Sequence, residues 1–507
     1  MMKKIRSIYY IICVALGLVM ASCVDDDSFS TSTSDVLAFS TDTVSLDTTF
    51  SNVPTPTRSL WVYNRSNKGI RCQLVRLESG NQTGFRVNVD GTYLGQSSGF
   101  QTQDVEIRKG DSIRVFVELT SKQQGEDGPQ LVEDNLIFAL ESGVQQKVNL
   151  KAYSWDAELL KDGLTVKRGE TMTLPADGTS KPIVVYGGIK VDTAAVLNIL
   201  PGTTLYFHEN AGLQVYGTLH SKGEKGKEVV LRGDRIDHMF DYLPYDRTPG
   251  RWQGIRLRSS SVGNVISFTD IHSPYNGILV DSCHNEAYNK ESKLVLSSST
   301  VHNCQGYGVK VDSAAIVTIE NCQISNTLDN CLYVHGAQVK VNQATLAQFY
   351  PFSSLRKEAL KFVAPDTLRV TNSLITGYAD DEVSGVRIEN EPFRFGFDHC
   401  VLRTEKPNTD DSLRFTHVLY EHVKEDSIKQ GEGETATYLH VGKGHFVKFD
   451  TNNLVYDFHL RSVSAAVGVA DPSTTTREDR DGNERNLEKP DAGCYQHQEK
   501  QEEEKKE

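Results

Sequence analysis

The feature that most constrains the fold is a short strand-like unit that recurs through the C-terminal two thirds of the chain. Each unit has two alternating apolar residues, a small polar residue and then another aliphatic residue. Five copies align, at residues 265–271, 294–301, 317–324, 368–375 and 393–402. Their equivalent apolar positions are Ile266, Leu296, Ile319, Val370 and Phe397. These positions are 30, 23, 51 and 27 residues apart, and 51 is about two units. A period of about twenty to thirty residues is typical of a solenoid.

The repeating unit contains strands only, which excludes helical repeats, and the consensus of a leucine-rich repeat is absent. A parallel β-helix remains, in which each turn is a coil of short strands stacked on the next. Equivalent inward positions then form aliphatic ladders, and Asn or Ser side chains at the bends form ladders of their own. The pairs Asn303-Cys304 and Asn321-Cys322 are expected at corner and core positions.

Two further stretches resemble bacterial right-handed β-helix proteins. Residues 196–207 are similar to the first full coil of such proteins. Residues 457–460, 465–468, 481–483 and 490–495 are similar to their closing turns. The resemblance implies a right-handed parallel β-helix over residues 155–496, and it implies no particular activity.

A different texture precedes the repeats. Residues 36–154 contain short strands of period two that are separated by turn residues, which is typical of a β-sandwich. The expected strands are 43–49, 60–63, 85–89, 113–117, 136–140 and 147–153. About 119 residues fit one immunoglobulin-like domain, and its single Cys72 excludes an internal disulfide. The predicted fold class is therefore all-β, a sandwich followed by a solenoid.

The N-terminus reads as an export signal. Lys3, Lys4 and Arg6 precede an uncharged apolar run from Ser7 to Val24. The run ends in Leu-Val-Met-Ala-Ser-Cys at residues 18–23, which resembles a bacterial lipobox. The resemblance implies cleavage of a signal peptide at residues 1–22, with palmitate and diacylglycerol on Cys23. Two or three acyl chains hold a protein on a membrane stably. An uncleaved signal anchor is the alternative.

Asp25, Asp26 and Asp27 follow that cysteine, and a Ser/Thr-rich stretch follows them. Residues 23–35 are expected to be a flexible tether. The acidic triplet resembles the surface-export signal of lipoproteins in the Bacteroidota, and a plain solvated spacer is the alternative. The export reading places the protein on the outer membrane, lipid-anchored and facing the extracellular side.

The charge excludes one class of partner. The formal net charge is −13, and loss of the three basic residues in segment 1–22 makes it −13 − 3 = −16. A chain of that charge repels phosphate backbones, so no nucleic-acid binding is expected. Residues 497–507 are a highly charged tail, which we expect to be disordered.

Carbohydrate-cleaving β-helices carry recognisable sets of catalytic residues. Polygalacturonases carry Asn-Thr-Asp, paired Asp, Gly-His-Gly and Arg-Ile-Lys motifs in that order. The nearest matches here are Asn326-Thr327 before Asp329, Asp380-Asp381, Gly442 to His445, and Arg387-Ile388-Glu389, and they fail at most positions. The stretch Asp380 to Glu382 is predicted to be a solvated loop.

Polysaccharide lyases need a base near carboxylates that bind calcium. The candidates are Lys310, Lys340, Asp270, His272 and Asp281. They are scattered in the sequence, although outward positions on neighbouring coils of a β-helix can converge. No signature selects any of them, so no catalytic residue is predicted.

No metal or other cofactor is predicted either. His440 and His445 have no partner at ligand spacing, and a hairpin turn explains their intervening glycines better. Cys304, Cys322, Cys331 and Cys400 lack paired spacing, so they are expected to pack as small apolar residues.

Two aromatic insertions interrupt the coil, at residues 237–252 and 348–352. Their aromatic residues are Phe240, Tyr242, Tyr245, Trp252, Phe349, Tyr350 and Phe352. Exposed aromatics stack on sugars or anchor a protein interface, and the alternative is a loop that folds back onto its own coil.

The functional expectation is a non-catalytic accessory or scaffold subunit at the cell surface. The expected partners are an outer-membrane β-barrel protein and other surface lipoproteins, in a complex of the β-barrel assembly or nutrient-uptake porin type. Binding of a surface carbohydrate, or its cleavage, is the alternative.

Overall fold

The computed structural model describes residues 28–176, 181–285, 288–409, 411–421, 427–430 and 437–498. The predicted signal peptide, Cys23 and the acidic triplet at residues 25–27 lie outside these residues, as does the end of the charged tail from residue 499. The chain divides into two compact units, residues 1–156 and 157–507. In the described part of the chain, no helix is long and apolar enough to cross a membrane.

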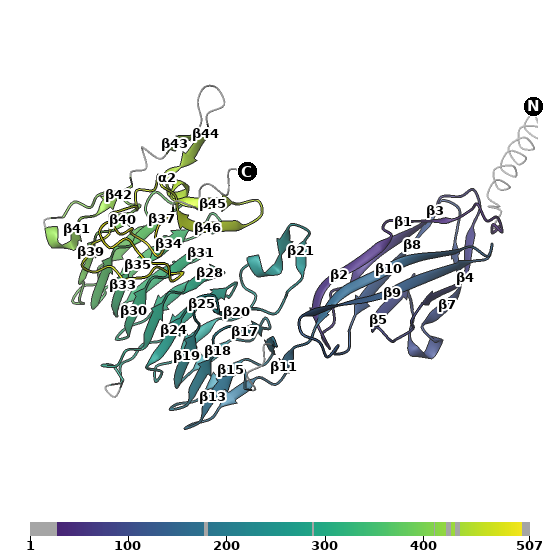
Figure 1. The fold of residues 1–507 in the computed structure, drawn as a ribbon, viewed down its shortest axis with the longest axis horizontal. Helices are drawn as coiled ribbons and strands as arrows, with labels where there is room; N and C mark the ends of the chain where they lie inside the picture. The colour runs from purple at the N-terminus through teal and green to yellow at the C-terminus, as the bar shows by residue number, and fades with distance from the viewer. Residues whose placement is uncertain are drawn as a thin grey trace, which may run out of the picture. The chain divides into compact units, whose positions relative to one another are not determined.

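The first unit is a β-sandwich of two five-stranded sheets (Figure 1). One sheet has the order β1 (Leu37–Phe39), β3 (Arg58–Asn64), β8 (Ser112–Leu119), β5 (Phe85–Val89), β6 (Thr92–Tyr93). The other has the order β2 (Thr43–Phe50), β10 (Gln145–Trp155), β9 (Pro129–Leu140), β4 (Ile70–Leu77), β7 (Gln101–Ile107). A 3-10 helix, η1 (Gln96–Ser98), precedes β7.

Period-two alternation decides which side chains enter the core of the sandwich. In β8, Ile113, Val115 and Val117 are buried, whereas Arg114 and Phe116 between them are exposed. Cys72 is buried and carries no disulfide, so apolar packing holds the sheets together. The predicted sandwich is confirmed.

The start of the Ser/Thr-rich stretch contacts this sandwich. The amide of Ser30 donates to the carbonyl of Gly69 at 2.8 Å. The guanidinium of Arg71 lies 4.2 Å from the ring centre of Phe29. The apolar ring of Phe29 thus packs on the sandwich, while residues 31–34 are exposed.

The second unit is a parallel β-helix with three sheets (Figure 1). Sheet I contains β11 (Glu158–Leu160), β14 (Ile183–Val185), β17 (Thr204–Phe207), β20 (Val229–Gly233), β25 (Thr269–His272), β28 (Thr300–Cys304), β31 (Gln323–Thr327), β34 (Thr345–Gln348), β37 (Leu374–Gly377), β40 (Val401–Leu402) and β42 (Leu419–Tyr420). Sheet II contains β12 (Leu164–Val166), β15 (Ile189–Val191), β18 (Leu213–Val215), β23 (Ile255–Leu257), β26 (Ile278–Val280), β29 (Val309–Val311), β32 (Leu332–His335), β35 (Leu360–Val363) and β38 (Val383–Val386). Sheet III contains β13 (Thr171–Leu174), β16 (Val196–Ile199), β19 (Thr218–Lys222), β24 (Asn264–Ser267), β27 (Leu294–Ser297), β30 (Ile316–Glu320), β33 (Gln338–Asn342), β36 (Thr367–Thr371), β39 (Phe395–Asp398) and β41 (Phe415–Thr416).

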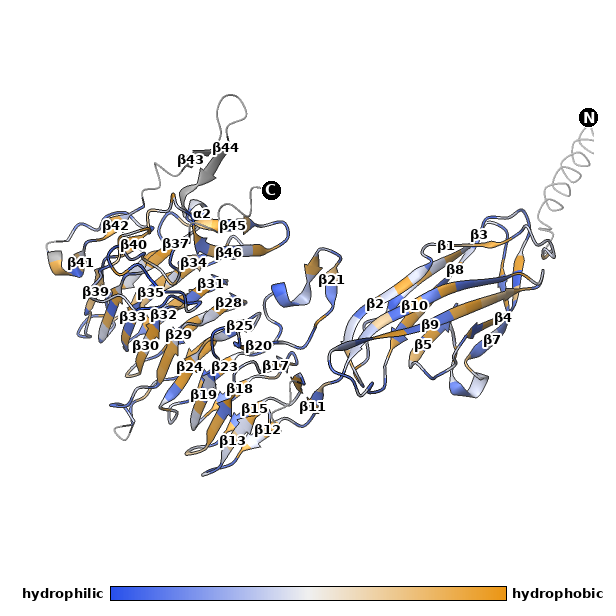
Figure 2. Cartoon of the chain, in the orientation of Figure 1, coloured by the Kyte–Doolittle hydropathy of each residue, from blue (hydrophilic) through white to orange (hydrophobic). Residues whose placement is uncertain are grey.

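The repeat alignment made from the sequence matches the register of sheet III. Ile266 pairs with Leu296, Leu296 with Ile319, and Val370 with Phe397. Val341 fills the long interval, because it pairs with Ile319 on one side and Val370 on the other. All of these residues are buried, and the alternating colours of the strands in Figure 2 follow the same inward and outward pattern. The predicted β-helix is therefore confirmed.

The corners between sheets III and I repeat one backbone device. A residue with positive φ stands there in each coil from the fourth onward: Phe268, Ser298, Asn321, Gln343, Asn372, His399 and His417, with φ between 43° and 51°. Asn is well suited to this left-handed conformation because its short side chain bonds locally. Asn303 occupies another corner with φ 55°, and Cys304 and Cys322 are fully buried. The corner and core positions predicted for the two Asn-Cys pairs are confirmed.

Two boundaries of the stack differ from the sequence-based expectation. Residues 196–207 lie in the second and third coils, because five strands, β11 to β15, precede them in the three sheets. At the other end the stacked strands stop at Tyr420. The residues that resembled closing turns belong instead to a segment that folds back, which includes the antiparallel hairpin β45 (Phe446–Asp450) and β46 (Val455–Leu460).

We call residues 445–497 the return segment. Its amide at Asp471 donates to the side chain of Asn372, and the hydroxyl of Thr476 bonds to the side chain of Asn321, two coils earlier. Arg480 then pairs with Glu228 at 2.5 Å, in an even earlier coil. The return segment therefore runs back along the corner beside sheet I, and Figure 1 shows the hairpin lying over the later strands of that sheet. Its apolar side chains and the outer face of β34, β37 and β40 form one core: Ala347, Phe349, Leu374, Val401, Phe446, Phe458, Leu460, Ala466, Ala492, Cys494 and Tyr495.

A hairpin and two short helices precede the return segment. The hairpin β43 (Ser427–Gln430) and β44 (Thr437–His440) leads into the short helix α2 (Val441–Gly444), and η3 (Ser412–Arg414) lies before β41. The turn expected at the two glycines between His440 and His445 is thus one turn of helix and not a hairpin. The hairpin closes earlier in the chain, so the glycines lie after its second strand.

Candidate functional site

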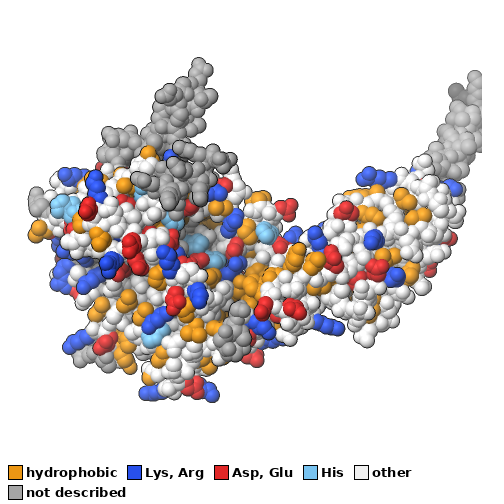
Figure 3. Space-filling view, in the orientation of Figure 1, with side chains coloured by type: hydrophobic (Ala, Val, Ile, Leu, Met, Phe, Trp, Pro, Cys, Tyr) orange, Lys and Arg blue, Asp and Glu red, His pale blue; other side chains and the backbone are white. Residues whose placement is uncertain are grey.

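The outer face of sheet I differs between its two halves. The return segment covers the later strands, whereas β17, β20, β25 and β28 turn a set of polar and aromatic side chains outward. These are Tyr206, Arg232, Asp270, His272 and His302. Figure 3 shows several separate histidine side chains among charged ones on the visible face of the solenoid. We take this face as the candidate functional site.

Asp270, His272 and His302 form the centre of the face. Nδ1 of His272 lies 3.1 Å from one carboxylate oxygen of Asp270, and Nε2 of His302 lies 3.1 Å from the other. The two imidazole rings are 5.3 Å apart between centroids. Burial alone raises the pKa of Asp270, but the two imidazoles outweigh it and hold this pKa well below its usual range. The carboxylate is therefore ionised at neutral pH.

The strand register produces this cluster. Asp270 and His272 are two residues apart on β25, so they point to the same side of the sheet. His302 lies directly opposite His272 on the next coil. The indole of Trp252 donates to the carbonyl of His272 at 2.9 Å, and the following residue, Ser273, turns the corner with φ 61°. These contacts fix the backbone from which the ring of His272 projects.

The insertion at residues 237–252, which we call the flap, borders the cluster on one side. It contains β21 (His238–Phe240), β22 (Leu243–Pro244) and η2 (Tyr245–Arg247). Asp246 pairs with Arg232 at 3.2 Å, and its carbonyl accepts the hydroxyl of Ser273. Arg232, the basic residue nearest to the cluster in the strand register, is therefore already paired with the carboxylate of Asp246.

The return segment borders the other side with a second group of ionised side chains. His459 bonds to Asp457 at 2.6 Å and to Asp481 at 2.8 Å. Burial lowers the pKa of His459, but the two carboxylates raise it to about 9. The ring of Tyr495 lies 4.1 Å from that of His459, and its hydroxyl donates to Gln323 on β31.

Flap and return segment meet above sheet I. The guanidinium of Arg247 in η2 donates to the carbonyl of Asn453 at 2.9 Å, in the turn between β45 and β46. The candidate face is thus bordered by two segments that are about two hundred residues apart in the sequence. Such a border is typical of binding sites, where loops on a rigid scaffold carry the contacts.

Three of the seven predicted interface aromatics are buried, so the prediction of an exposed surface is wrong for Trp252, Phe349 and Tyr350. Trp252 is 0% exposed and stacks on Phe207 at 4.5 Å. Phe349 is held in the core under the return segment. Large apolar rings gain free energy by covering a neighbouring strand surface. At these three residues the insertions therefore fold back onto their own coil, as the alternative interpretation expected.

The remaining aromatics are accessible to different degrees. Phe240 and Tyr242 are 54% and 57% exposed, and their rings stack at 5.8 Å. Tyr245 is partly covered, because the guanidinium of Arg235 lies 3.9 Å above its ring. Phe352 is 47% exposed at the end of the second insertion.

The prediction of a solvated loop at residues 380–382 is wrong for Glu382. Asp380 and Asp381 are exposed, but Glu382 is 0% exposed. Its carboxylate accepts the amides of Ala359 and Ala379, each at 2.7 Å. Burial raises the pKa of Glu382 to about 8 although both amides lower it. Glu382 directly precedes β38, and its buried carboxylate satisfies these two backbone donors.

A buried network of hydrogen bonds joins Ser464, His445 and Glu421. Nδ1 of His445 lies 2.7 Å from the hydroxyl of Ser464, and Nε2 bonds to Glu421. Glu421 also accepts the hydroxyl of Thr376. The residue types match a hydrolase triad, but all three side chains are buried and link the last coil to the return segment. We assign this hydrogen-bond network a structural role.

The lyase candidates are not brought together as a set. Lys310 pairs with Asp312, and Asp281 pairs with Arg256 and Arg258 on sheet II, while Lys340 is exposed on sheet III. Only Asp270 and His272 meet. The polygalacturonase-like residues Asn326 and Thr327 are buried at a corner.

Sequence reasoning missed His302 and His459. The repeat alignment contained a signal for the first, because two aligned units end at Ile271 and Val301 and a histidine follows each of them. Extending both units by one residue pairs His272 with His302. No comparable signal marks His459, because it reaches the face from the return segment.

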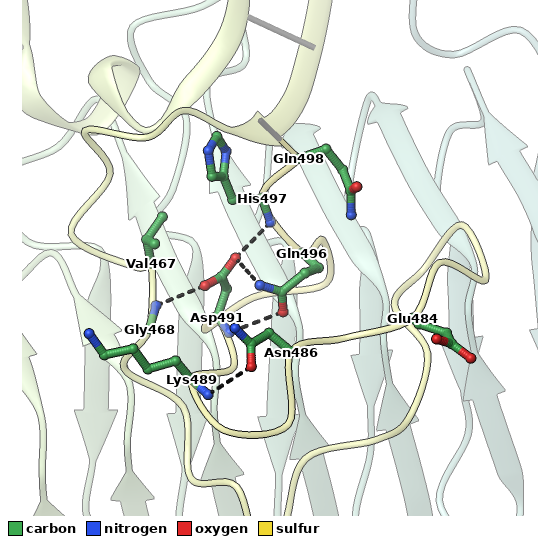
Figure 4. Close-up of a pocket in the computed structure, with 9 residues that line it drawn as sticks. All are labelled: Val467, Gly468, Glu484, Asn486, Lys489, Asp491, Gln496, His497 and Gln498. Carbon is green, nitrogen blue, oxygen red and sulfur yellow. Dashed lines mark hydrogen bonds between the residues drawn. The ribbon is translucent and has the colours of Figure 1, made fainter. Parts of the chain in front are cut away.

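Two other polar features complete the unit. Asp398 accepts bonds from His399 and His417 through one oxygen, at 2.9 Å and 3.2 Å. A pocket of about 650 Å³ lies in the return segment (Figure 4). The carboxylate in that pocket, Asp491, accepts from Gly468, Gln496 and His497, so it fastens the surrounding loops.

The predicted packing of the cysteines is confirmed. Cys304, Cys322, Cys331 and Cys400 are each 0% exposed and carry no disulfide.

Comparison with known proteins agrees with the fold. Residues 188–390 match the family model described as "Right handed beta helix region". Among curated proteins, none matches the sequence. Solved structures resemble it only at low identity, and three serve as examples. The catalytic unit of the thermostable GH87 α-1,3-glucanase from Streptomyces thermodiastaticus strain HF3-3 has 10% identity and a TM-score of 0.19, over 71% of this chain and 88% of that chain.

The second structure is the family 28 exopolygalacturonase of Yersinia enterocolitica, with 9% identity and a TM-score of 0.19 over 74% of this chain and 82% of that chain. The third is an ASH / PapD-like domain of human CEP192, with 12% identity and a TM-score of 0.17 over 27% of this chain and 94% of that chain. Scores this low carry no argument about activity.

Proposed function

We propose that the protein is a non-catalytic lipoprotein on the outside of the outer membrane, and that its solenoid docks on an outer-membrane protein complex. The partner is a β-barrel protein of the assembly or nutrient-uptake type. The signal peptide, Cys23 and the acidic triplet supply the anchor and the export route in this proposal.

The observation that carries the proposal is the exposed aromatic pair of the flap. Phe240 and Tyr242 present two stacked rings that are more than half exposed. Exposed aromatics of this size are frequent anchors of protein interfaces. Asp241, which lies between the two residues in the sequence, is exposed as well.

The flap is also held in place before any partner binds. Arg235 bonds to Asp237 through two nitrogens, at 2.7 Å and 2.6 Å, and covers the ring of Tyr245. Leu243 is buried, and Trp252 fixes the far end of the flap in the core. A pre-ordered contact surface loses little conformational entropy on binding.

The test is a pulldown in mild detergent followed by mass spectrometry, from cells that carry either the wild-type chain or the double variant Phe240→Ala/Tyr242→Ala. We expect a β-barrel protein to copurify with the wild type and to be lost from the double variant. Tyr275→Ala is the matched control, because Tyr275 is 47% exposed on the solenoid and does not belong to the flap. Recovery of the wild-type protein alone contradicts the proposal.

The anchor is tested separately. Labelled palmitate should mark the wild-type chain and leave Cys23→Ala unmarked, and a protease added to intact cells should digest the anchored protein. An unlabelled wild-type chain contradicts the proposed lipid anchor, and the proposed docking surface is independent of that result.

A carbohydrate ligand is the second candidate, and the same aromatic pair favours it, because exposed rings stack on sugars. A glycan array separates the two candidates. Binding of a glycan that is lost in the double variant and kept in Tyr275→Ala would replace the protein partner. An assay for released reducing sugars or unsaturated uronates then distinguishes binding from cleavage.

A further inference from the structure

Three side chains of the types that ligate metal ions converge on sheet I, and the docking proposal makes no use of them. One donor atom each from Asp270, His272 and His302 lies within 4.8 Å of the other two. Each imidazole faces a different oxygen of the carboxylate, at 3.1 Å in both cases.

The spacing suits a metal ion of the first transition row. Two ligand atoms at about 2.0 Å from a tetrahedral zinc ion are about 3.3 Å apart. The contacts between the carboxylate of Asp270 and the nitrogens of His272 and His302 are close to that value. An ion among them replaces these two contacts with metal–ligand bonds, which the unprotonated ring nitrogens make.

We propose that Asp270, His272 and His302 form a binding site for a divalent transition-metal ion of the zinc type. Two imidazole nitrogens select such ions over calcium and magnesium, which prefer oxygen ligands. The side chains of Asp270 and His302 are 25% and 27% exposed, so water reaches the site and supplies the fourth ligand.

The scaffold holds the three ligands in place without an ion. Asp270 and His272 share β25, and the adjacent β28 carries His302 in direct register with His272. The backbone of His272 is fixed by the buried indole of Trp252. The positive charge of Arg232 is compensated by Asp246, so it does not repel an arriving cation.

The second cluster with the same residue types is less suited to hold an ion. His399 and His417 both face one oxygen of Asp398, which also accepts the hydroxyl of Thr416 at 2.7 Å. The side chain of His417 is 69% exposed. A variant at this cluster therefore serves as the matched control.

The test uses the full chain, extracted in detergent and carrying an affinity tag without histidines. After treatment with EDTA, the protein is dialysed against zinc chloride, and bound zinc is measured by mass spectrometry of the metal. We expect one equivalent in the wild type, less than a tenth of an equivalent in His302→Gln and Asp270→Asn, and one equivalent in His417→Gln. Cobalt chloride supplies a spectroscopic check, because a tetrahedral site gives strong visible absorption that the first two variants should lack.

The wild type alone provides a further measurement in case a variant does not fold. Zinc should protect His302 from modification by diethyl pyrocarbonate and leave His417 reactive, as read by peptide mass spectrometry. The proposal is overturned if the wild type binds no zinc after EDTA treatment. It is also overturned if His302→Gln, folded as judged by circular dichroism, binds as much zinc as the wild type, or if zinc protects His417 and not His302.

Discussion

His272 lies directly opposite His302 in the parallel pairing of β25 and β28, although 302 − 272 = 30 residues separate them in the chain. One coil of the solenoid spans that interval, so equal positions in consecutive repeats become neighbours on the surface. The same rule that aligns Ile266 with Leu296 inside the coil aligns these two imidazoles outside it. A solenoid thus converts a repeat in the sequence into a line of side chains in space, and function can develop wherever the outward line carries reactive groups.

The pairing of His459 with two carboxylates predicts a pH-dependent stability. Its pKa in the folded chain is about 9, above the usual 6.5 of an unfolded histidine. The folded state therefore holds a proton that the unfolded state releases first. This contribution, at most about 3 kcal/mol, is present in full below pH 6.5 and is lost as the pH rises through 9.

Denaturant unfolding of the solenoid at pH 6.5, 8 and 9.5 measures this effect. We expect the free energy of unfolding to fall across that range in the wild type, and the fall to be smaller in His459→Gln. His335→Gln, at a partly exposed position of sheet II, is the control and should follow the wild type. An unchanged slope in His459→Gln would contradict the assignment.

Asn321 is expected to fasten the return segment. Its side chain bonds to Thr476, to the carbonyl of Glu478 and to the guanidinium of Arg485. Asn321→Ala removes these bonds and also places a less suitable residue at a positive φ, so we expect a loss of about 2–4 kcal/mol.

Asn303→Ala is the matched control for that substitution. Asn303 has a similar φ of 55°, but its side chain receives a single bond of 3.4 Å from Asn326. We expect a loss of about 1 kcal/mol. Limited proteolysis should release the return segment faster in Asn321→Ala only, and equal rates in both variants would refute this role.

The inward ladder of sheet III should dominate the stability of the solenoid. Ile319 is fully buried between Leu296 and Val341 on the neighbouring coils. Ile319→Ala leaves a cavity and should cost about 2–5 kcal/mol. The adjacent outward residue gives the control, because Thr318→Ala should change the free energy of unfolding by less than about 0.5 kcal/mol. Chemical denaturation measures both, and equal effects would contradict the assignment of the ladder.

The buried thiols should be inert until the units unfold. Burial raises the pKa of Cys72 and of Cys322 to about 12, so neither forms a thiolate at neutral pH. We expect no labelling by iodoacetamide in the native protein and full labelling in guanidinium chloride. Peptide mass spectrometry at intermediate denaturant then reports the sandwich through Cys72 and the solenoid through Cys322. Labelling of either thiol in the native state would contradict its burial.

Much of the fold could be predicted from the sequence because it depends on local periodicity. Alternation of period two placed strands in the sandwich, and the recurrence of Leu296 and Ile319 at like positions predicted stacked coils. Both signals are short-range consequences of side-chain geometry and apolar burial, which act on each strand in the same way. The corner positions of Asn303 and Asn321 followed from the same repeat.

Only the tertiary structure decided which segments cover the outer face of the solenoid and which side chains they bury. The return segment has no sequence repeat, so its sequence did not predict that it folds back over sheet I. The contact between His459 and Tyr495 depends on that folding back. Trp252 and Phe349 read as exposed aromatics because an insertion looks the same in sequence whether it reaches outward or packs inward. Glu382 likewise reads as part of an acidic loop, and only the fold shows the two amides that it satisfies. These features depend on contacts between distant residues, which a local pattern does not record, whereas the strands and their coil depend on the pattern itself.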